Sequence, residues 1–226
     1  MARKVYRWRL VPDGGIEHVV VSENEGDVVA EGVIVGGGGA SAFGLRYRFV
    51  LDADWAGWRS AHVTLVGGIT LALRHDGYGG WTDASGQPRP ELAGARDLLL
   101  GASAFTLAAM IKRIGPKADG KVREGKAVHL AVPTLKAAQS SFTLGVPEAG
   151  RIDLGFAEEA ARHAIAIDKD GFVADWPGLF ERIDLGATSA PPDAATAEPT
   201  ERVSAEPAEK PAKTGKAGRK TTRASG

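Results

Sequence analysis

The sequence predicts a mainly β, single-domain protein with an antiparallel sheet, one or few short helices and a disordered C-terminal tail. Thirty glycines punctuate the 226 residues and separate short runs of β-branched and aromatic residues. From Ala187 onwards the chain has almost no large apolar side chains, so it cannot bury enough surface to fold. Residues 1–186 are therefore expected to form the domain, and residues 187–226 the tail.

The first third of the chain reads as a series of paired strands. In residues 43–51 apolar and arginine side chains alternate, which is typical of a half-buried strand. Gly67 and Gly68 form a two-residue step that favours a hairpin turn. Residues 36–39 are four glycines, expected to be a mobile loop or the edge of a binding hollow. The expected strands are Val5–Leu10, Ile16–Val21, Asp27–Val35, Phe43–Leu51, Trp58–Val66 and Ile69–His75.

The middle of the chain contains the expected helix. Residues 102–114 follow helical spacing, and Gly115-Pro116 should end the helix. Further strands are expected at Val128–Leu135, Ser140–Leu144 and Arg151–Phe156. Residues 157–163 have helical propensity but are too few to form an isolated helix, so a strand there remains the alternative.

The C-terminal part of the domain is expected to end in a corner. Residues 168–183 read as a turn, an extended segment and a Pro-Gly corner that holds a Leu-Phe pair. Ordered structure should end there.

Charge divides the chain into a nearly neutral domain and a basic end. After Glu209 the tail has six basic residues and no acidic one, so residues 210–226 could contact nucleic acid or an anionic membrane weakly and non-specifically. A solubilising extension is the alternative. The N-terminus lacks the apolar run of a secretory signal, and no segment has ~20 consecutive apolar residues, so a cytoplasmic protein without a transmembrane segment is expected.

The sequence contains no catalytic or metal-binding motif. Cysteine is absent, and the five histidines lie far apart, without the spacing that would place two imidazoles on one helix face. No catalytic residue, metal or cofactor is therefore predicted. Glu17 and His18 are neighbours on a strand and should point to opposite faces, but a His–carboxylate pair could still form between strands.

The arginines of the first strand allow two orientations. Arg7 and Arg9 share one face, whereas Tyr6, Trp8 and Leu10 share the other. Facing outward, the arginines would be solvated. Facing inward, they would need carboxylate partners such as Glu17, because an unpaired buried guanidinium is too costly.

Several short motifs in a fixed order resemble the bacterial putative glycolipid-binding family over about residues 3–185. They are Arg7-Trp8-Arg9, Glu17-His18, Tyr47-Arg48, Arg59, the segment 97–113, Gln139 and Trp176-Pro-Gly-Leu-Phe-Glu-Arg182. The resemblance implies a strongly bent antiparallel sheet, an open or barrel-like half-shell with an apolar hollow suited to acyl chains. The segment from Ser103 to Ile111 departs from the family pattern. Leu107 replaces an Asn and two prolines are missing, so this segment should be more helical than in relatives.

The resemblance and the residue types together predict non-catalytic binding of an amphipathic lipid, with a glycolipid as the expected class. Arg7, Glu17, Arg59 and Gln139 are expected at the head group, and Trp8, Phe105 and Met110 in the apolar wall. His18, Tyr47, Thr106 and Arg113 complete the predicted ligand-binding set. A hydrolase acting on a lipid or glycoside, and an interaction module tethered by its basic tail, remain the alternatives.

Overall fold

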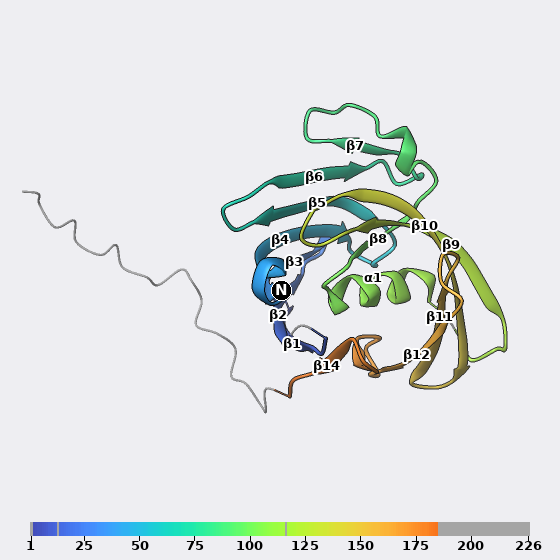
Figure 1. The fold of residues 1–226 in the computed structure, drawn as a ribbon. Coiled ribbons are helices and arrows are strands. Elements are labelled where there is room, and N and C mark those ends of the chain that lie inside the picture. The colour runs from blue at the N-terminus through green and yellow to red at the C-terminus, as the bar shows by residue number, and fades with distance from the viewer. Residues whose placement is uncertain (1, 13, 116, 185–226) are drawn as a thin grey trace, which may run out of the picture. The chain divides into compact units, whose positions relative to one another are not determined.

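In the computed structural model, residues 2–12, 14–115 and 117–184 are described. Within them, fourteen strands form a single sheet that curves around one α-helix, α1 (Ala104–Ile114) (Figure 1). This confirms the predicted mainly β fold with an open, bent sheet. The predicted disordered tail, residues 187–226, lies outside the described residues.

The strands follow one another around the sheet. Those of the first half are β1 (Ala2–Leu10), β2 (Gly15–Glu23), β3 (Asp27–Gly36), β4 (Phe43–Asp52), β5 (Trp58–Leu65), β6 (Thr70–His75) and β7 (Trp81–Asp83). Those of the second half are β8 (Asp97–Leu100), β9 (Val122–Leu130), β10 (Ala137–Glu148), β11 (Arg151–Phe156), β12 (Arg162–Ile167), β13 (Val173–Trp176) and β14 (Phe180–Arg182). Two 3-10 turns, η1 (Gly39–Ser41) and η2 (Pro90–Leu92), lie in connections.

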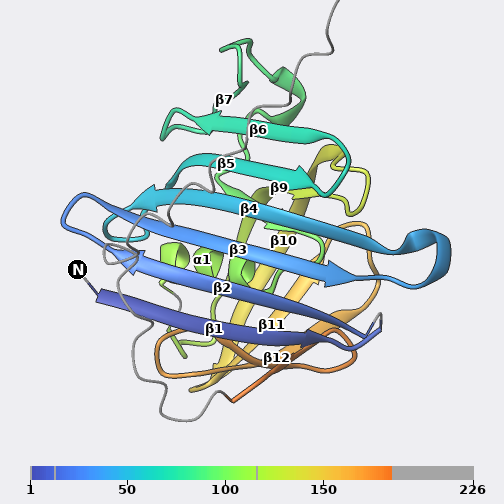
Figure 2. The same cartoon turned by 90° about the vertical axis from the view of Figure 1, so that its left-hand side faces the viewer.

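Pairing between β1 and β14 joins the two halves of the sheet. Trp8 lies opposite Arg182, and Leu10 opposite Phe180. From this junction the sheet runs through β2 to β7 on one side and through β13 to β8 on the other, as Figures 1 and 2 show. Neighbouring strands are antiparallel except β8 and β9, which are parallel. The two edges, β7 and β8, do not pair with each other, so the sheet stays open.

Helix α1 occupies the concave side of the sheet. Its N-cap Ser103 accepts a hydrogen bond from the backbone N–H of Thr106, and Gly115 ends it in the left-handed conformation at φ 55°. The predicted helix and its stop at Gly115 are thus confirmed. Residues 104–111 are buried on every side, as expected for a helix that is apolar all round. The resemblance implies a hollow on this concave side; α1 fills its middle.

Some boundaries differ from the predicted ones. Strand β3 continues to Gly36, and residues 39–41 form η1, where a loop of four glycines was expected. Strand β9 begins at Val122, six residues before the predicted start, because the mainly polar segment 122–126 extends it beyond the apolar run. Residues 162 and 163 belong to β12, so the strand alternative holds for that part of 157–163.

Candidate functional site

The carboxylate of Glu17 holds the N-terminus of α1 to the sheet. Glu17 on β2 is fully buried, and its two oxygens accept four hydrogen bonds. The hydroxyls of Tyr47 and Ser103 donate to one oxygen, and the backbone N–H groups of Ala104 and Phe105 donate to the other. A carboxylate at a helix N-terminus satisfies free N–H groups and interacts favourably with the helix dipole. Glu17 is therefore an anchor between strand and helix.

Gly32 lets Tyr47 reach Glu17. Tyr47 on β4 lies opposite Gly32 on β3, and its hydroxyl bonds to Glu17 on β2 at 2.7 Å. A Cβ atom at position 32 would overlap the Tyr47 ring. The missing side chain therefore allows the ring to cross a whole strand, which explains a glycine within a run of β-branched residues.

Burial sets the protonation of this anchor. Desolvation raises the pKa of Glu17 from its ordinary 4.5 to about 7, although hydrogen bonds from Ser103, Tyr47 and the two amides act in the opposite direction. Burial and the neighbouring Glu17 also raise the pKa of Tyr47, which is thus a neutral donor. The anchor exists in both charged and protonated forms near neutral pH.

A second buried carboxylate holds the last turn of α1. Asp97, at the start of β8, is fully buried and receives two hydrogen bonds of 2.6 Å from the guanidinium of Arg113. Burial raises the pKa of Asp97, and the Arg113 charge lowers it in part. Near the same end, Lys112 lies 4.8 Å from the centre of the Trp55 ring and 5.1 Å from that of Phe172. Helix α1 is thus fixed to the sheet at both ends.

A partly open pocket remains beside the N-terminal half of α1. It has a volume of about 200 Å³, and we call it the inner hollow. Its walls are mainly apolar side chains of the helix and of the second half of the sheet, with Ser103, Thr106, His129, Glu159 and His163 as polar members. The apolar lining consists of Leu99, Leu100, Leu107, Leu154, Phe156, Trp176, Leu179 and Phe180.

Polar groups gather where the inner hollow meets the surface. A cleft of about 270 Å³ shares His129, Phe156 and Glu159 with the hollow, and adds Ser140 and Glu158. The Oγ of Ser140 donates to Glu158 at 2.8 Å. His163 Nε2 lies 2.8 Å from a carboxylate oxygen of Glu159. We call this region the rim cleft; it offers hydrogen-bond donors and acceptors beside an apolar space.

Trp176 contributes a donor without an acceptor. Its side chain lines the inner hollow and is 8% exposed, and its ring packs against His163 with centroids 5.4 Å apart. The indole Nε1 is buried and has no hydrogen-bond partner among the described residues. Buried N–H groups normally have a partner, so an unpaired one in the wall of a hollow is a position that a ligand oxygen could fill.

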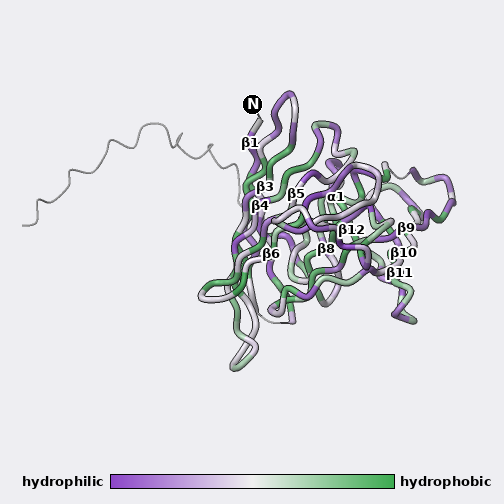
Figure 3. Tube along the Cα trace, turned by 90° about the horizontal axis from the view of Figure 1, so that it is seen from above, coloured by the Kyte–Doolittle hydropathy of each residue, from purple (hydrophilic) through white to green (hydrophobic). Residues whose placement is uncertain are grey.

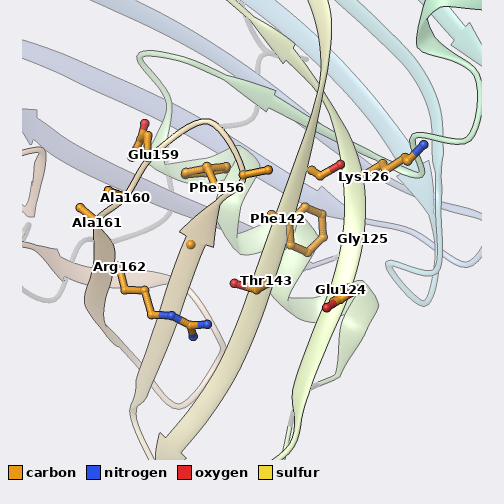
Figure 4. Close-up of a pocket in the computed structure, with 13 residues that line it drawn as sticks. Glu124, Gly125, Lys126, Phe142, Thr143, Phe156, Glu159, Ala160, Ala161 and Arg162 are labelled. Carbon is orange, nitrogen blue, oxygen red and sulfur yellow. The ribbon is translucent and has the colours of Figure 1, made fainter.

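A further groove of about 590 Å³ lies across β9 to β12 (Figure 4). Most of its charged and hydroxyl side chains come from β9, β10 and β12, among them Glu124, Lys126, Thr143 and Arg162. We call it the outer groove. It shares Phe156 and Glu159 with the inner hollow, so the end of β11 and the connection after it separate the two spaces.

The structure separates the predicted head-group residues. Arg7 is exposed, and its Nε donates to Nδ1 of His18 on the outer face; Arg59 is exposed and bonds to Asp52 at 2.6 Å. Glu17 faces inward. Of the two orientations considered for Arg7, the structure therefore has the outward one, on the face opposite to Glu17. Gln139 donates to the carbonyl oxygen of Ala93 and lines the rim cleft. The expected cluster of Arg7, Glu17, Arg59 and Gln139 is therefore not assembled.

The remaining predicted residues lie along α1 and its surroundings. Trp8, Phe105 and Met110 are fully buried in the core, and Trp8 donates to the carbonyl oxygen of Val173. Thr106 lines the inner hollow, whereas Tyr47 and Arg113 belong to the two anchors of α1. Apart from Gln139, sequence reasoning missed the residues of the rim cleft. Their only local signal is that they are polar residues near the ends of predicted strands. Among the described residues, no group of three or more His, Asp or Glu side chains is suited to a metal ion.

Comparison with known proteins agrees with this architecture. Residues 5–182 match the protein family described as putative glycolipid-binding. The chain belongs to this family. The same match covers every strand from β2 to β14 and the whole of α1, so the inner hollow and both anchors lie within the family domain.

Two solved structures are similar to this family member. A DUF1089 family protein from Pseudomonas aeruginosa is 27% identical, with a TM-score of 0.64 over 74% of this chain and 92% of that one. A β-barrel-like protein of a domain of unknown function, DUF1849, from Brucella abortus is 10% identical, with a TM-score of 0.44 over 80% and 93%. No curated protein matches. Within the described residues, no helix has the length and apolar character needed to cross a membrane.

Proposed function

We propose that this protein binds an amphipathic lipid without chemical conversion, with the apolar part in the inner hollow and the polar head at the rim cleft. The observation that carries the proposal is that the two spaces are neighbours, with His129, Phe156 and Glu159 in the walls of both. An apolar space beside a polar one matches the two parts of such a ligand. Membership of a family named for glycolipid binding supports the same class of ligand.

Size and energetics favour partial insertion of an acyl chain. The inner hollow, at about 200 Å³, equals roughly seven times the ~30 Å³ that one water molecule takes in the liquid. It therefore suits a short length of chain. Five buried methylene groups would contribute about 4 kcal/mol of gross binding free energy. The chain would supply most of the affinity, because each neutral hydrogen bond adds only about 1 kcal/mol.

Polar side chains at the rim cleft suit a head group rich in hydroxyls. His129, Ser140 and the Glu159–His163 pair provide both donors and acceptors within one region. A sugar has the same mixture of donors and acceptors, whereas a simple anion would meet Glu158 and Glu159. The rim would thus set specificity for a neutral or glycosylated head group.

The hydrolase alternative finds less support. Glu17 is fully buried with both oxygens occupied by donors, whereas His18 lies on the outer face beside Arg7. These two residues cannot form one acid–base pair. The anchoring of α1 accounts for all four hydrogen bonds of Glu17.

Titration of the delipidated full chain with a fluorescent fatty-acyl probe tests the proposal. Leu179→Trp narrows the inner hollow from its half-buried edge and should weaken probe binding at least tenfold. Leu71→Trp, at a half-buried position on β6, is the matched control and should bind as the wild type does. Thr143→Trp narrows the outer groove instead. Loss of binding in that variant alone, or no binding by the wild type, would overturn the proposal.

A further inference from the structure

One end of the curved sheet exposes apolar side chains, of which those of Ile16, Val35 and Val66 belong to the outer face. Ile16, Val35, Val66 and Ile69 are 45%, 58%, 80% and 56% exposed, respectively. We call these four residues the apolar tip. They come from β2, β3 and the β5–β6 hairpin, which reach the same end of the sheet, with β4 between β3 and β5 (Figure 2).

Strand register makes the tip continuous. Ile16 lies opposite Val35, and Val35 lies opposite Gly44. The backbone N–H of Val66 donates to the carbonyl oxygen of Gly44 at 2.8 Å, and the side chains of Val35 and Val66 approach Gly44 from both sides. Because Gly44 has no side chain of its own, the two valines border one surface. Contiguous exposed apolar surface of this kind marks an interaction site.

Two of the three connections at this end carry no charge, whereas the sequence of the β1–β2 connection contains Asp13. Residues 32–45 and 63–73 contain no Asp, Glu, Lys or Arg. Figure 3 shows the two hairpin ends that project at its lower left in white and green, the colours of neutral and hydrophobic residues. A solvated hairpin of a soluble sheet usually has polar or charged turn residues, so this end is unusually suited to an apolar environment.

Positive charge lies directly behind the tip. The next row of cross-strand neighbours on the outer face runs from Arg7 through His18 and Val33 to Arg46. Successive rows on one face are about 7 Å apart. Arg46 has no carboxylate of the described residues within ion-pair distance, and Arg7 bonds to the ring of His18. We call Arg7 and Arg46 the basic row.

We propose that the apolar tip and the basic row dock this protein on the surface of an anionic lipid bilayer. The apolar side chains would enter the interface between head groups and acyl chains, while the two guanidinium groups would bind lipid phosphates at head-group depth. Charge complementarity selects this partner: an apolar surface backed by the guanidinium groups of Arg7 and Arg46 fits a negatively charged membrane. This inference adds a partner to the proposed function and does not depend on it.

Docking at the tip would place the inner hollow close to the membrane. The backbone N–H of Val11, at the end of β1, donates to the carbonyl oxygen of Leu179 at 2.9 Å, and Leu179 lines the hollow. Leu10 borders Gly36 at the end of β3. The hollow and the tip thus lie at the same end of the first strands. If the proposed lipid binding is correct, a docked protein could exchange lipid with the bilayer.

Co-sedimentation of the full chain with vesicles tests the docking surface. Vesicles of phosphatidylcholine with 30% phosphatidylglycerol should retain the wild type, and vesicles of phosphatidylcholine alone should retain much less. Val66→Asp combined with Ile69→Asp should lower retention at least fivefold. Val122→Asp, at a valine that is 52% exposed on β9, is the control and should not change it. Unfolding temperatures should match across variants because these side chains are exposed.

A second pair of variants tests the basic row. Arg46→Ala should lower retention on anionic vesicles at least threefold, whereas Arg74→Ala, an exposed arginine on β6 farther from the tip, should have a smaller effect. Residues 187–226 are the same in every variant, so any contribution of the basic tail cancels. Equal retention of the tip variant and the wild type on vesicles would overturn the proposal. It would also be overturned if the substitutions at the tip dissociated a dimer of the wild type and left vesicle binding unchanged. The tip variant should still bind the acyl probe in solution, so failure of docking and failure of lipid binding can be distinguished.

Discussion

The hydroxyl of Tyr47 donates a hydrogen bond to the buried carboxylate of Glu17 at 2.7 Å, across the backbone of Gly32. The same carboxylate binds the first N–H groups of α1. Residues of three neighbouring strands, β2, β3 and β4, therefore position α1 on the concave side of the sheet. The inner hollow lies beside the helix end that this contact fixes, so the anchor also determines the shape of the candidate site.

Gly32→Ala is expected to destabilise the protein by displacing the Tyr47 ring. The new methyl group would overlap that ring, and overpacking in a core typically costs about 1–3 kcal/mol. Urea denaturation of the two single variants and the double variant, with Tyr47→Ala as the partner, measures the coupling. The cost of Gly32→Ala should shrink once the ring is absent. An unchanged cost would show that the ring does not need this glycine.

Stability should fall as the pH rises through the titration of Glu17. Because burial raises the pKa of Glu17 from 4.5 to about 7, the folded state holds this proton more tightly than the unfolded state does. The resulting stabilisation is complete below about pH 4.5 and is lost as the pH rises through about 7.

Glu17→Gln provides the comparison, because its side chain cannot titrate. The free energy of unfolding of the wild type relative to this variant should decrease by up to about 3 kcal/mol between about pH 4.5 and 8. Chemical denaturation at a series of pH values measures it. A difference that stays constant with pH would contradict the raised pKa.

Arg113→Ala should be strongly destabilising. It leaves the fully buried carboxylate of Asp97 without its partner, and breaking a buried ion pair in this way typically costs about 3–5 kcal/mol. Arg123→Ala removes a more exposed pair with Asp119 and should cost at most about 1 kcal/mol. Equal losses in the two variants, measured by thermal unfolding, would argue against the Asp97–Arg113 pair as an anchor of α1.

Trp176→Phe should weaken lipid binding without a comparable loss of stability. If a ligand oxygen accepts the free indole N–H, removing the donor costs about 1 kcal/mol, or roughly a fivefold loss of affinity. Trp58→Phe is the matched control, since the indole N–H of Trp58 is also without a partner in the described part of the chain but does not line the inner hollow. Acyl-probe titrations compare the two, and equal affinities would exclude the Trp176 donor from binding.

Local sequence signals predicted the strands and the helix well. Alternation in residues 43–51 depends only on near neighbours, and Gly115 ends α1 through its own backbone conformation. The inward direction of Glu17 also follows from the alternation of side chains along β2, because Glu17 shares a face with Val19 and Val21. The short strands β7, β8, β13 and β14 lack such patterns, since each has only three or four residues.

The site depended on contacts that local patterns do not contain. Ser103 is 86 residues from Glu17 in the chain, and nothing in either segment indicates the other. His129, His163 and Trp176 come together only because β9 to β13 curve around α1. The resemblance gave the correct class of fold. Residue type alone suggested a cluster of Arg7 with Glu17, but the side chain of Arg7 lies on the outer face of β1, away from the buried Glu17.

A crystal structure of the full chain with a brominated fatty-acyl ligand tests the central claim most directly. The account predicts an anomalous bromine peak between α1 and β11 to β14, bordered by Leu107, Leu154 and Trp176. A peak in the outer groove beside Thr143 and Arg162, or an unoccupied inner hollow at saturating ligand, would contradict it.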